Sequence, residues 1–475
     1  MNGKKWLSGL SALALIALAA GCGGGSATMP VVQQQSGLVF VSGTDAPLPS
    51  VISFQVMVTG ISVAEGTSTP ITVTNGPQTV DFARLDGLHT LLDMNSIPAG
   101  TYDTVSVALA SPQIVYLNVT NPQTNPPTPP TINTLTSTTT PPAVLGTSTV
   151  TFNLSSPLVV TTGQVVGLAL DFKIEKSLAL DQNGQITGMI NPTMTLNVVT
   201  PSDADAYIDE FIAGVTTVNA TGNSFTIQGP HGRAYTVNVN SQTEWEGGDT
   251  IDDLSNTSIV AISGTLDRTD GTFLADTVAI LSQNSFYAGG LITYVNPPVN
   301  TATSFDLFVR DVLPANTGFT SDQISTIDLT GNEKYLVYWM HNVFLNPDWS
   351  NGFFNAALLV PGQHVSIGGP LANGNVTVKR VVLRHEGHTG TLVPNSTNVG
   401  ASTFQFNSNG LAGVLFNGPV TVYVTPFTTF GGGLTGLNSL SSNPTNTLRV
   451  VGVVLKDPIS SQPVFVARSV TELTD

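Results

Sequence analysis

Short segments in which apolar and polar residues alternate recur along this chain from residue 37 onward. Examples are the segments 38–41, 53–58 and 104–109. A period of two places one face of a strand on a core and the other face in water. The 46 glycines and 30 prolines supply many turns between such strands. We therefore predict an all-β protein.

The composition limits the number of domains and the kinds of partner. Charged residues make up 10% of the 475 residues, against about 25% in an average soluble domain. The formal net charge is −16, which repels nucleic acid and anionic lipid head groups, so neither is an expected partner. One cysteine allows no internal disulfide. Several domains are expected, because single cores rarely grow beyond ~250–300 residues.

The first 22 residues have the order of an export signal. Lys4 and Lys5 precede an apolar run over residues 7–18, which is shorter than the roughly 20 residues that a membrane span requires. The run leads into Leu-Ala-Ala-Gly and then Cys22, the one cysteine of the chain. This ending resembles a lipobox, and the resemblance implies cleavage before Cys22 and lipid on its thiol. The alternative is an ordinary signal peptide that is cut elsewhere.

The lipobox resemblance also predicts where the chain resides. Residues 1–21 would be the signal peptide, and residues 22–36, which carry no charge, would be a flexible tether. Gly23 follows the cysteine where an aspartate would retain a lipoprotein at the inner membrane. By this resemblance we expect the lipid on Cys22 to anchor the chain to the outer membrane, on its periplasmic face or at the cell surface.

Residues 37–200 are predicted to form a β-sandwich. A Pro/Gly turn at residues 97–102 leads into an alternating strand, which is typical of sandwiches. The Pro/Thr-rich insert 119–142 cannot form a central strand, because proline donates no ladder hydrogen bond, and we expect a surface loop there. Residues 81–92 are expected to hold a short helical turn. The turn Asp181–Gly184 joins two strands of a hairpin.

A pattern of five alternating strands then recurs in residues 207–283, 284–386 and 387–475. In each copy the first strand carries glycine, the fourth ends on glycine, and the longest connection lies between strands three and four. In the second copy we place strand three at residues 335–338. An OB-type barrel has its longest connection at this place, and an SH3-like barrel is the alternative. The predicted fold is a β-sandwich followed by three small five-stranded OB-like or SH3-like barrels.

Two families are suggested by short motifs. The motifs Thr44–Pro47, Ile97–Tyr102 and Leu170–Phe172 together resemble a bacterial domain family of unknown function that is typical of lipoproteins, over residues 37–199. The three repeats resemble a second family of unknown function, made of small β-barrels. Its pattern ends strand three on Thr-x-Trp or Thr-x-Phe, as at Thr243–Trp245 and Thr428–Phe430, whereas the second copy has Val337–Trp339. Neither family implies an activity or catalytic residues.

Four further candidates for chemistry favour ordinary structural roles. Gly431–Gly436 fits GxGxxG, but the Asn/Ser/Pro/Thr-rich segment behind it is unsuited to a phosphate-binding helix. His385–His388 is not HExxH, and we expect solvated histidines in a linker. Asp45 is expected to serve a turn before Pro47. An acidic loop is a weak calcium candidate without EF-hand spacing, and its acids are Glu244, Glu246, Asp249, Asp252 and Asp253.

An aromatic segment in the second repeat is the best candidate for ligand binding. Aromatic rings beside Asn and Asp suit sugars, which present apolar faces and hydroxyl groups. The alternative is a local core that holds the insert in place. The candidate residues are Tyr338, Trp339, Trp349 and Phe353.

The sequence therefore predicts a non-catalytic, lipid-anchored envelope protein that acts as a binding or scaffolding module. No cofactor is expected, and neither a GxSxG elbow nor a phosphate-binding Gly-Lys-Ser/Thr loop is present. One alternative is a lectin-like lipoprotein that binds polysaccharide through the aromatic insert. Another is an enzyme whose site is assembled between domains. The expected partners are the membrane, through Cys22, and a polysaccharide or an envelope protein.

Overall fold

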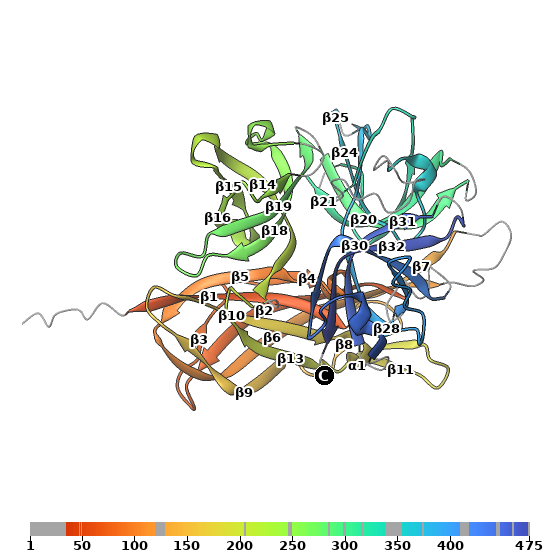
Figure 1. Ribbon diagram of the computed structural model, residues 1–475. Coiled ribbons are helices and arrows are strands. Elements are labelled where there is room, and N and C mark those ends of the chain that lie inside the picture. The colour runs from red at the N-terminus through yellow and green to blue at the C-terminus, as the bar shows by residue number, and fades with distance from the viewer. Residues whose placement is uncertain are drawn as a thin grey trace, which may run out of the picture. The chain divides into compact units, whose positions relative to one another are not determined.

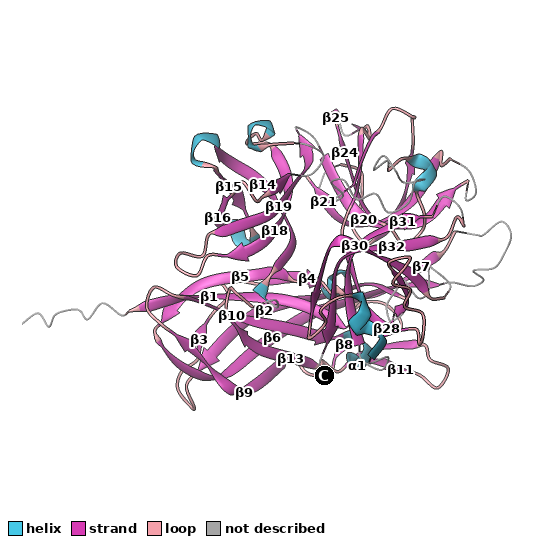
Figure 2. Cartoon of the chain, viewed as in Figure 1, coloured by secondary structure: helices cyan, strands magenta, loops and turns pink. Residues whose placement is uncertain are grey.

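In its described part, the computed structural model consists of β-strands joined by loops, with short helices such as α1 (Ile174–Ser177) (Figure 2). The prediction of an all-β protein is confirmed. None of the described helices has the length and apolar character of a transmembrane helix. Gln35–Asp475 forms one compact unit. The structure describes residues 35–473 except 47, 49, 119–128, 204–205, 246–248, 284–285, 298–300, 315–316, 338–353, 373–374, 409–417, 443–446 and 458–459.

Two sheets that share a core make up most of residues 36–199. The first has the order β13-β10-β1-β5, in which β1 (Ser36–Ala46) is parallel to β10 (Val165–Lys173). The second is built on the antiparallel pair β2 (Val51–Ala64) and β6 (Gly100–Asn118) (Figure 1). Inward-facing side chains of both sheets form one hydrophobic core. The other strands are β3 (Ile71–Thr72), β4 (Gln78–Asp81), β5 (Thr90–Pro98), β7 (Thr131–Leu135), β9 (Thr149–Val160) and β13 (Met194–Val199).

The predicted hairpin at residues 178–190 is present, whereas the predicted loop at residues 119–142 is partly replaced by a strand. β11 (Leu178–Leu180) and β12 (Ile186–Ile190) form the expected antiparallel hairpin, to which β8 (Val144–Leu145) adds in parallel. The expectation of a loop throughout residues 119–142 is wrong at β7, which pairs with the end of β6. This strand contains no proline and lies at the edge of its sheet, where few ladder bonds are needed.

The first sheet is buried on both faces, whereas the alternating pattern predicted one face in water. Val39 and Val41 of β1 point into the core between the two sheets. Phe40, between them in sequence, belongs to a second core that includes Phe211 and Phe273. The prediction is therefore wrong for β1, because the strands that follow this domain in sequence cover its second face.

Residues 208–283 form a closed five-stranded arrangement, which we call ring 1. Its order is β16-β15-β14-β18-β19, and β16 closes onto β19 in parallel. The short strand β17 (Glu244–Trp245) is added to β19, also in parallel. The ring strands are β14 (Ile208–Asn219), β15 (Ser224–Gln228), β16 (Ala234–Asn238), β18 (Ser258–Leu266) and β19 (Phe273–Gln283), with 3-10 turns η3 (Ala220–Gly222), η4 (Pro230–Gly232) and η6 (Ile251–Asp253).

Residues 286–383 form a sheet with the order β22-β21-β20-β24-β27-β23, which we call the open sheet. The third strand is β22 (Gln323–Asp328), which pairs with β21. The prediction placed strand three at 335–338, but β23 (Lys334–Val337) pairs in parallel with β27, as β17 does with β19. The other elements are β20 (Phe286–Asn296), β21 (Ser304–Leu313), β24 (His364–Gly369), β27 (Arg380–Leu383), the hairpin β25 (Leu371–Ala372) and β26 (Asn375–Val376), and η8 (Ala356–Leu358).

Residues 386–473 form a closed barrel, which we call ring 2, with the order β28-β29-β30-β32-β31. Its third and fifth strands are parallel, as in ring 1. Gly432, in the glycine-rich loop after β30, has φ +64°, and a Cβ there would lie 1.9 Å from the carbonyl oxygen of Glu472. This loop therefore packs closely against the backbone of β32. The elements are β28 (Glu386–Leu392), β29 (Thr403–Ser408), β30 (Val420–Gly431), β31 (Thr447–Lys456), β32 (Pro463–Leu473) and the 3-10 turn η9 (Leu437–Ser442).

Hydrophobic cores cross from one of these bodies to the next. The core of the open sheet includes Val453 and Val466 of ring 2. Ile259 of ring 1 packs in one cluster with Tyr287 of the open sheet. Ile52 of the N-terminal sheets lies in a cluster with open-sheet side chains. The division into four domains stays a prediction, since residues 35–475 pack as one unit.

Candidate functional site

Residues 81–89, from the last residue of β4 to the start of β5, form a segment that we call the clamp segment. The 3-10 turn η1 (Phe82–Leu85) opens it, as the sequence predicted for this region. Phe82 and Leu85 are buried in the core of the N-terminal sheets and fix the turn there. The polar side chains between and after them are therefore directed away from that core. Gly87, with φ +66°, bends the chain back toward β5.

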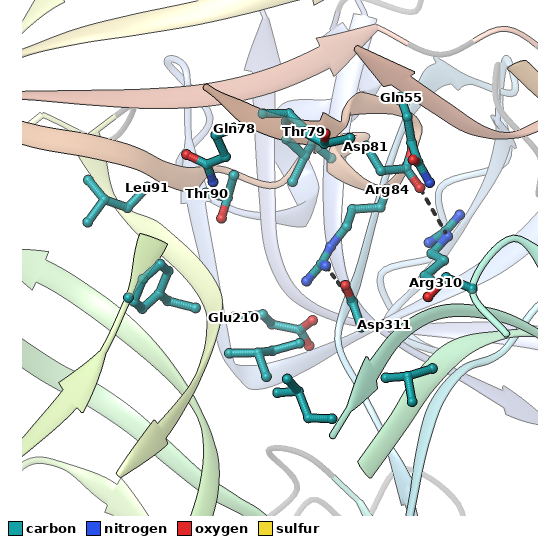
Figure 3. A pocket seen from close by; sticks show the side chains of 18 of the residues that line it. Gln55, Gln78, Thr79, Asp81, Arg84, Thr90, Leu91, Glu210, Arg310 and Asp311 are labelled. Carbon is teal, nitrogen blue, oxygen red and sulfur yellow. Dashed lines mark hydrogen bonds and ion pairs between the residues drawn. The ribbon is translucent and has the colours of Figure 1, made fainter. Parts of the chain in front are cut away.

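The first half of the clamp segment pairs with the open sheet. The Nη1 atom of Arg84 lies 2.5 Å from Oδ2 of Asp311 (Figure 3). The Nε atom of Arg310 lies 3.9 Å from Oδ2 of Asp81, and both side chains are largely buried. Arg310 also donates a 2.9 Å hydrogen bond to the carbonyl oxygen of Ile52. The two pairs have opposite directions: β21 supplies the acid to Arg84 and the base to Asp81.

The middle of the clamp segment contacts ring 2. Oδ1 of Asp86 accepts hydrogen bonds of 3.0 Å from both the backbone N–H and the hydroxyl of Thr389. Nδ1 of His388 lies 3.7 Å from Oδ2 of Asp86, and its Nε2 lies 3.1 Å from Oε2 of Glu386. A Cβ on Gly387 would lie 2.2 Å from the carbonyl oxygen of Asp86. Glycine at this position is what allows the two backbones to approach.

The end of the clamp segment contacts both rings. His89 and Asp209 of ring 1 exchange two hydrogen bonds, one between their backbones at 2.7 Å and one from the N–H of His89 to Oδ2 of Asp209 at 3.1 Å. The Nη1 atom of Arg449, in ring 2, lies 2.8 Å from Nε2 of His89. Nine residues of the N-terminal domain therefore make polar contacts with all three following bodies.

A second buried pair joins ring 1 to the end of the open sheet. Nη2 of Arg384 donates a 2.5 Å hydrogen bond to Oε2 of Glu210, and their side-chain exposures are 0% and 3%. Nη1 of Arg384 donates to the hydroxyl of Tyr287 at 2.7 Å. Glu210 sits in β14 with φ +44°, a conformation that few non-glycine residues adopt. Its geometry is thus imposed by the surrounding packing.

We call the clamp segment, the Glu210–Arg384 pair and their contacts in the other bodies the junction. Burial and these partners shift the pKa values of several junction residues. Burial and, to a smaller extent, the charge of Arg449 together lower the pKa of His89 to about 3. Burial lowers the pKa of His388 as well, but the neighbouring carboxylates of Asp86 and Glu386 outweigh it and raise that pKa to about 9. Burial raises the pKa of Asp209 to about 6 against the opposing charge of Arg468. His388 is therefore a cation held between carboxylates, and His89 is neutral.

A cavity of about 450 Å³ opens beside the clamp segment. Its walls come from β4 and the clamp segment, from Glu210 and Phe211 of ring 1, and from β21 of the open sheet (Figure 3). Most of the polar side chains on its walls are amides, hydroxyls and charges that already face a partner. A much smaller space of about 40 Å³ lies next to Asp86, Glu386 and His388.

Several residues singled out from the sequence have a different place from the one expected. The histidines of His385–His388 are buried, at 1% and 9% exposure, so the expectation of a solvated linker is wrong. The reason is that β28 begins at Glu386 and packs on the clamp segment. Asp45 lies within β1 and is buried, and its Oδ1 accepts from the N–H of Ile174, so the expected turn role is also wrong.

The four weak calcium candidates that the structure describes do not form a cluster. Asp249 pairs with Arg380 of the open sheet at 3.2 Å, and Asp253 caps its own 3-10 turn. Glu244 lies in β17 and Asp252 is exposed on η6. Among the described residues, no three His, Cys, Asp or Glu side chains are grouped as metal ligands would be. Outside the described residues lie Cys22, Glu246, Tyr338, Trp339, Trp349 and Phe353.

The junction residues were missed from the sequence, although a signal for them exists. The chain has only 15 lysines and arginines, and Arg84, Arg310, Arg384 and Arg449 all lie at the junction. Arginine is almost never fully buried without a partner, so an arginine inside an apolar β-rich segment marks a candidate for a buried pair. That argument marks the residues but does not say which acid each one meets.

The fold and junction define an all-β protein of several tightly packed bodies, and comparisons with known proteins agree in part. Residues 36–187 match the model of a domain of unknown function (DUF4382), and residues 214–279 match that of another domain of unknown function (DUF5666). The predicted succession of two such families is thereby confirmed over these ranges. No curated protein matches the chain.

Comparison with solved structures gives only a distant similarity. The Drosophila Unr CSD456 structure is similar over 56% of this chain and 97% of its own, with 9% sequence identity and a TM-score of 0.15. A TM-score of this size carries no argument about this chain.

Proposed function

We propose that the chain is a non-catalytic, lipid-anchored protein of the cell envelope that acts as a binding or scaffolding module. The observation that carries this proposal is the clamp segment, which pairs with the open sheet through Arg84 and with ring 2 through Asp86. A buried charge that loses its partner is costly, so such contacts favour one arrangement of the bodies. A fixed arrangement suits a protein that presents a surface to a partner.

The partners of the junction residues support a structural role for them. Glu210 is engaged by Arg384, and His388 lies between Asp86 and Glu386. A general base needs a shifted pKa and also access to a substrate proton. Both groups meet the first condition, but their side chains are almost fully buried beside these partners, and the lack of access supports the non-catalytic proposal.

The strand pairings support the finer proposal of OB-type barrels. In both rings the third and fifth strands are parallel, and the first strand pairs with the fourth. An OB-type barrel contains this parallel pair, while an SH3-like barrel is antiparallel throughout. The open sheet has the same strand order without closure, which supports a third, modified copy of the repeat. It also supports the proposed sandwich followed by three barrels.

The lipid anchor can be tested by fractionating cells that produce the full-length chain. We expect the wild type and a matched Ser26→Ala variant in the outer-membrane fraction, held by lipid on Cys22. The Cys22→Ala variant should instead appear in the soluble fraction, because it lacks the acylated thiol. A Cys22→Ala protein that still fractionates with membranes would contradict the anchor.

The scaffolding role can be tested by cross-linking in intact cells followed by mass spectrometry. The same neighbours should be recovered with the wild type and with an Arg268→Ala/Asp276→Ala control, whose side chains are exposed. They should be lost with Arg84→Ala/Asp86→Ala, which removes two clamp contacts. A hydrolytic or transfer activity that one substitution abolishes would refute the non-catalytic proposal.

Polysaccharide binding through the aromatic insert is a second candidate, favoured by one observation. The rings of Tyr335 and Phe354, which border the insert, meet edge to face with centroids 5.7 Å apart. This contact brings the two residues on either side of the insert together. In a pull-down on insoluble polysaccharides and peptidoglycan, Trp349→Ala should abolish binding, while Phe427→Ala, which changes a ring exposed elsewhere, should not. Equal retention of both variants would reject this candidate.

A further inference from the structure

A groove of about 460 Å³ lies between the edges of the two N-terminal sheets, at β9 and β13, which are both labelled in Figure 1. One wall is formed by residues 196–199 of β13 and the other by residues 154–156 of β9. Asp203 also lines the groove, and its Oδ2 accepts a 2.5 Å hydrogen bond from the N–H of Thr200, just beyond β13. In the described part of the chain β9 and β13 belong to different sheets and form no ladder with each other.

The strand β13 directs unpaired backbone groups toward this groove. It is the edge strand of its sheet, and within the described residues it pairs with β10 alone. The N–H of Lys173 donates a 2.9 Å hydrogen bond to the carbonyl oxygen of Thr193, which sets the phase of this antiparallel ladder. Because the residues that bond across such a ladder alternate, Asn197 faces β10. The N–H and C=O groups of Leu196 and Val198 therefore point away from β10.

The opposite wall is a bulge in β9. In the ladder with β6 the pairing passes from Asn153 to Leu158, and residues 154–157 have no pairing partner of their own. Ser155 and Ser156 are exposed in this bulge. A bulge interrupts a ladder and bends its strand, so here it stands opposite the free edge of β13 and leaves the groove between them.

An extended polypeptide matches this groove. The outward backbone groups of Leu196 and Val198 recur after two residues, about 6.8 Å along a strand, and a second strand presents donors and acceptors with the same period. The side chains of Leu154, Leu196 and Val198 are partly buried and can contact alternate side chains of such a segment. The carboxylate of Asp203 favours a segment that carries a positive charge. The net charge of −16 disfavours a second copy of this chain.

We propose that an extended segment of another protein, carrying a basic residue, adds to β13 as a further strand in this groove. Main-chain hydrogen bonds supply the affinity in this mode of binding, and alternate side chains supply the specificity. The inference goes beyond the binding module proposed above, because it names the partner and its place. None of the lining residues belongs to the clamp segment or to the aromatic insert. A failure here would therefore leave the anchoring and clamp experiments unaffected.

The test measures the binding of labelled synthetic hexapeptides to the full-length protein by fluorescence anisotropy. Their length matches the six residues of β13. In each probe Val, Leu or Ala alternates with Thr, and one end carries Lys. Each probe also has two N-methylated twins, one for each alternate set of its amides. Only one set of amides faces the neighbouring strand when a strand is added, so one twin should bind and the other should not.

The test variant is Ser155→Trp/Ser156→Trp, which fills the groove from the side of β9. The matched control is Ser148→Trp, at an exposed serine just before β9. Val198→Pro is a second variant, which removes an outward N–H and no bond to β10. An edge strand tolerates proline where its N–H faces solvent. The melting temperature of each variant shows whether it is folded.

We expect at least one probe to bind the wild type and Ser148→Trp equally, and to lose detectable binding to both groove variants. Bound peptide should slow the hydrogen exchange of the Leu196 and Val198 amides, whereas the Asn197 amide should exchange slowly with or without it. The proposal is overturned if no probe binds, if the two methylated twins bind alike, or if the groove variants bind like the wild type. A wild type that dimerises in sedimentation, with a monomeric Ser155→Trp/Ser156→Trp variant, would assign the groove to a second copy and also overturn it.

Discussion

At the scale of single residues, the account depends on charges that are buried and paired. Arg384 and Glu210 have side-chain exposures of 0% and 3% and lie 2.5 Å apart. Taking either charge out of water is expensive, and only the partner and the added bond to Tyr287 compensate for it. The pair contributes little net stability by itself, but removal of one member would leave an uncompensated buried charge at a large cost in free energy.

Replacing Glu210 by alanine should lower the free energy of unfolding by about 3–5 kcal/mol, because Arg384 would remain charged without its carboxylate. The matched control, Glu175→Ala at an exposed position of α1, should change it by less than about 0.5 kcal/mol. Urea unfolding followed by circular dichroism measures both. A Glu210→Ala loss no larger than that of the control would show that the pair does not hold the junction.

His388 should make stability depend on pH above neutrality. Its pKa is about 9 in the folded chain and about 6.5 in an unfolded one, so the folded state holds the proton more tightly. The resulting stabilisation is complete below pH 6.5 and is lost as the pH rises through 9. Its size is about 3 kcal/mol, at 1.36 kcal/mol per unit of pKa.

Unfolding midpoints in urea at pH 6, 7.5 and 9 test this dependence. The wild type should lose stability over this range, and His388→Gln should lose less because it has no proton to release. An NMR titration of the His388 ring gives the same quantity directly. A ring that titrates near 6.5 would contradict the ion pairs with Asp86 and Glu386.

At the scale of elements, the docking of β28 on the clamp segment depends on the missing side chain of Gly387. A Cβ there would meet the backbone of Asp86 at 2.2 Å, and backbone cannot give way as a flexible side chain can. The same strand carries His388 and Thr389 to Asp86. A shift of β28 would therefore loosen several contacts together.

Gly387→Ala should destabilise the protein by about 1–3 kcal/mol, which is typical of overpacking. Gly214→Ala is the matched control, since this glycine also lies in a strand but has no atom within 4 Å of the added Cβ. The control should be neutral or slightly stabilising, because alanine loses less backbone entropy than glycine. Thermal unfolding of the two variants measures this difference. Equal melting temperatures would argue against a close contact between Gly387 and the backbone of Asp86.

The same elements show how far the sequence could predict this structure. Strand positions in ring 1 and ring 2 follow from alternation and turn residues, which are local signals. The strand β22 was missed because Ile324 and Ile327 are its only apolar residues. The double burial of β1 was missed because alternation does not show what covers the second face, and Phe40 looked like any strand residue. The clamp was missed because Asp86 and Thr389 are 303 residues apart.

At the scale of the whole molecule, the central claim is that residues 35–475, which pack as one compact unit, unfold as one cooperative unit. The cores are shared between bodies, as where Phe40 of β1 packs with ring 1 and Val466 of ring 2 packs with the open sheet. The clamp segment adds polar contacts to each body. Separate bodies on flexible linkers would unfold separately, whereas bodies that share cores unfold together.

Differential scanning calorimetry of the full-length protein is the measurement that tests this claim most directly. The account predicts one endotherm whose calorimetric and van't Hoff enthalpies agree, because no body keeps its core when a neighbour unfolds. In Arg84→Ala/Asp86→Ala the transition should move to a lower temperature and broaden, and the exposed Arg268→Ala/Asp276→Ala control should match the wild type. Two or more resolved transitions in the wild type would show independent domains and contradict the account.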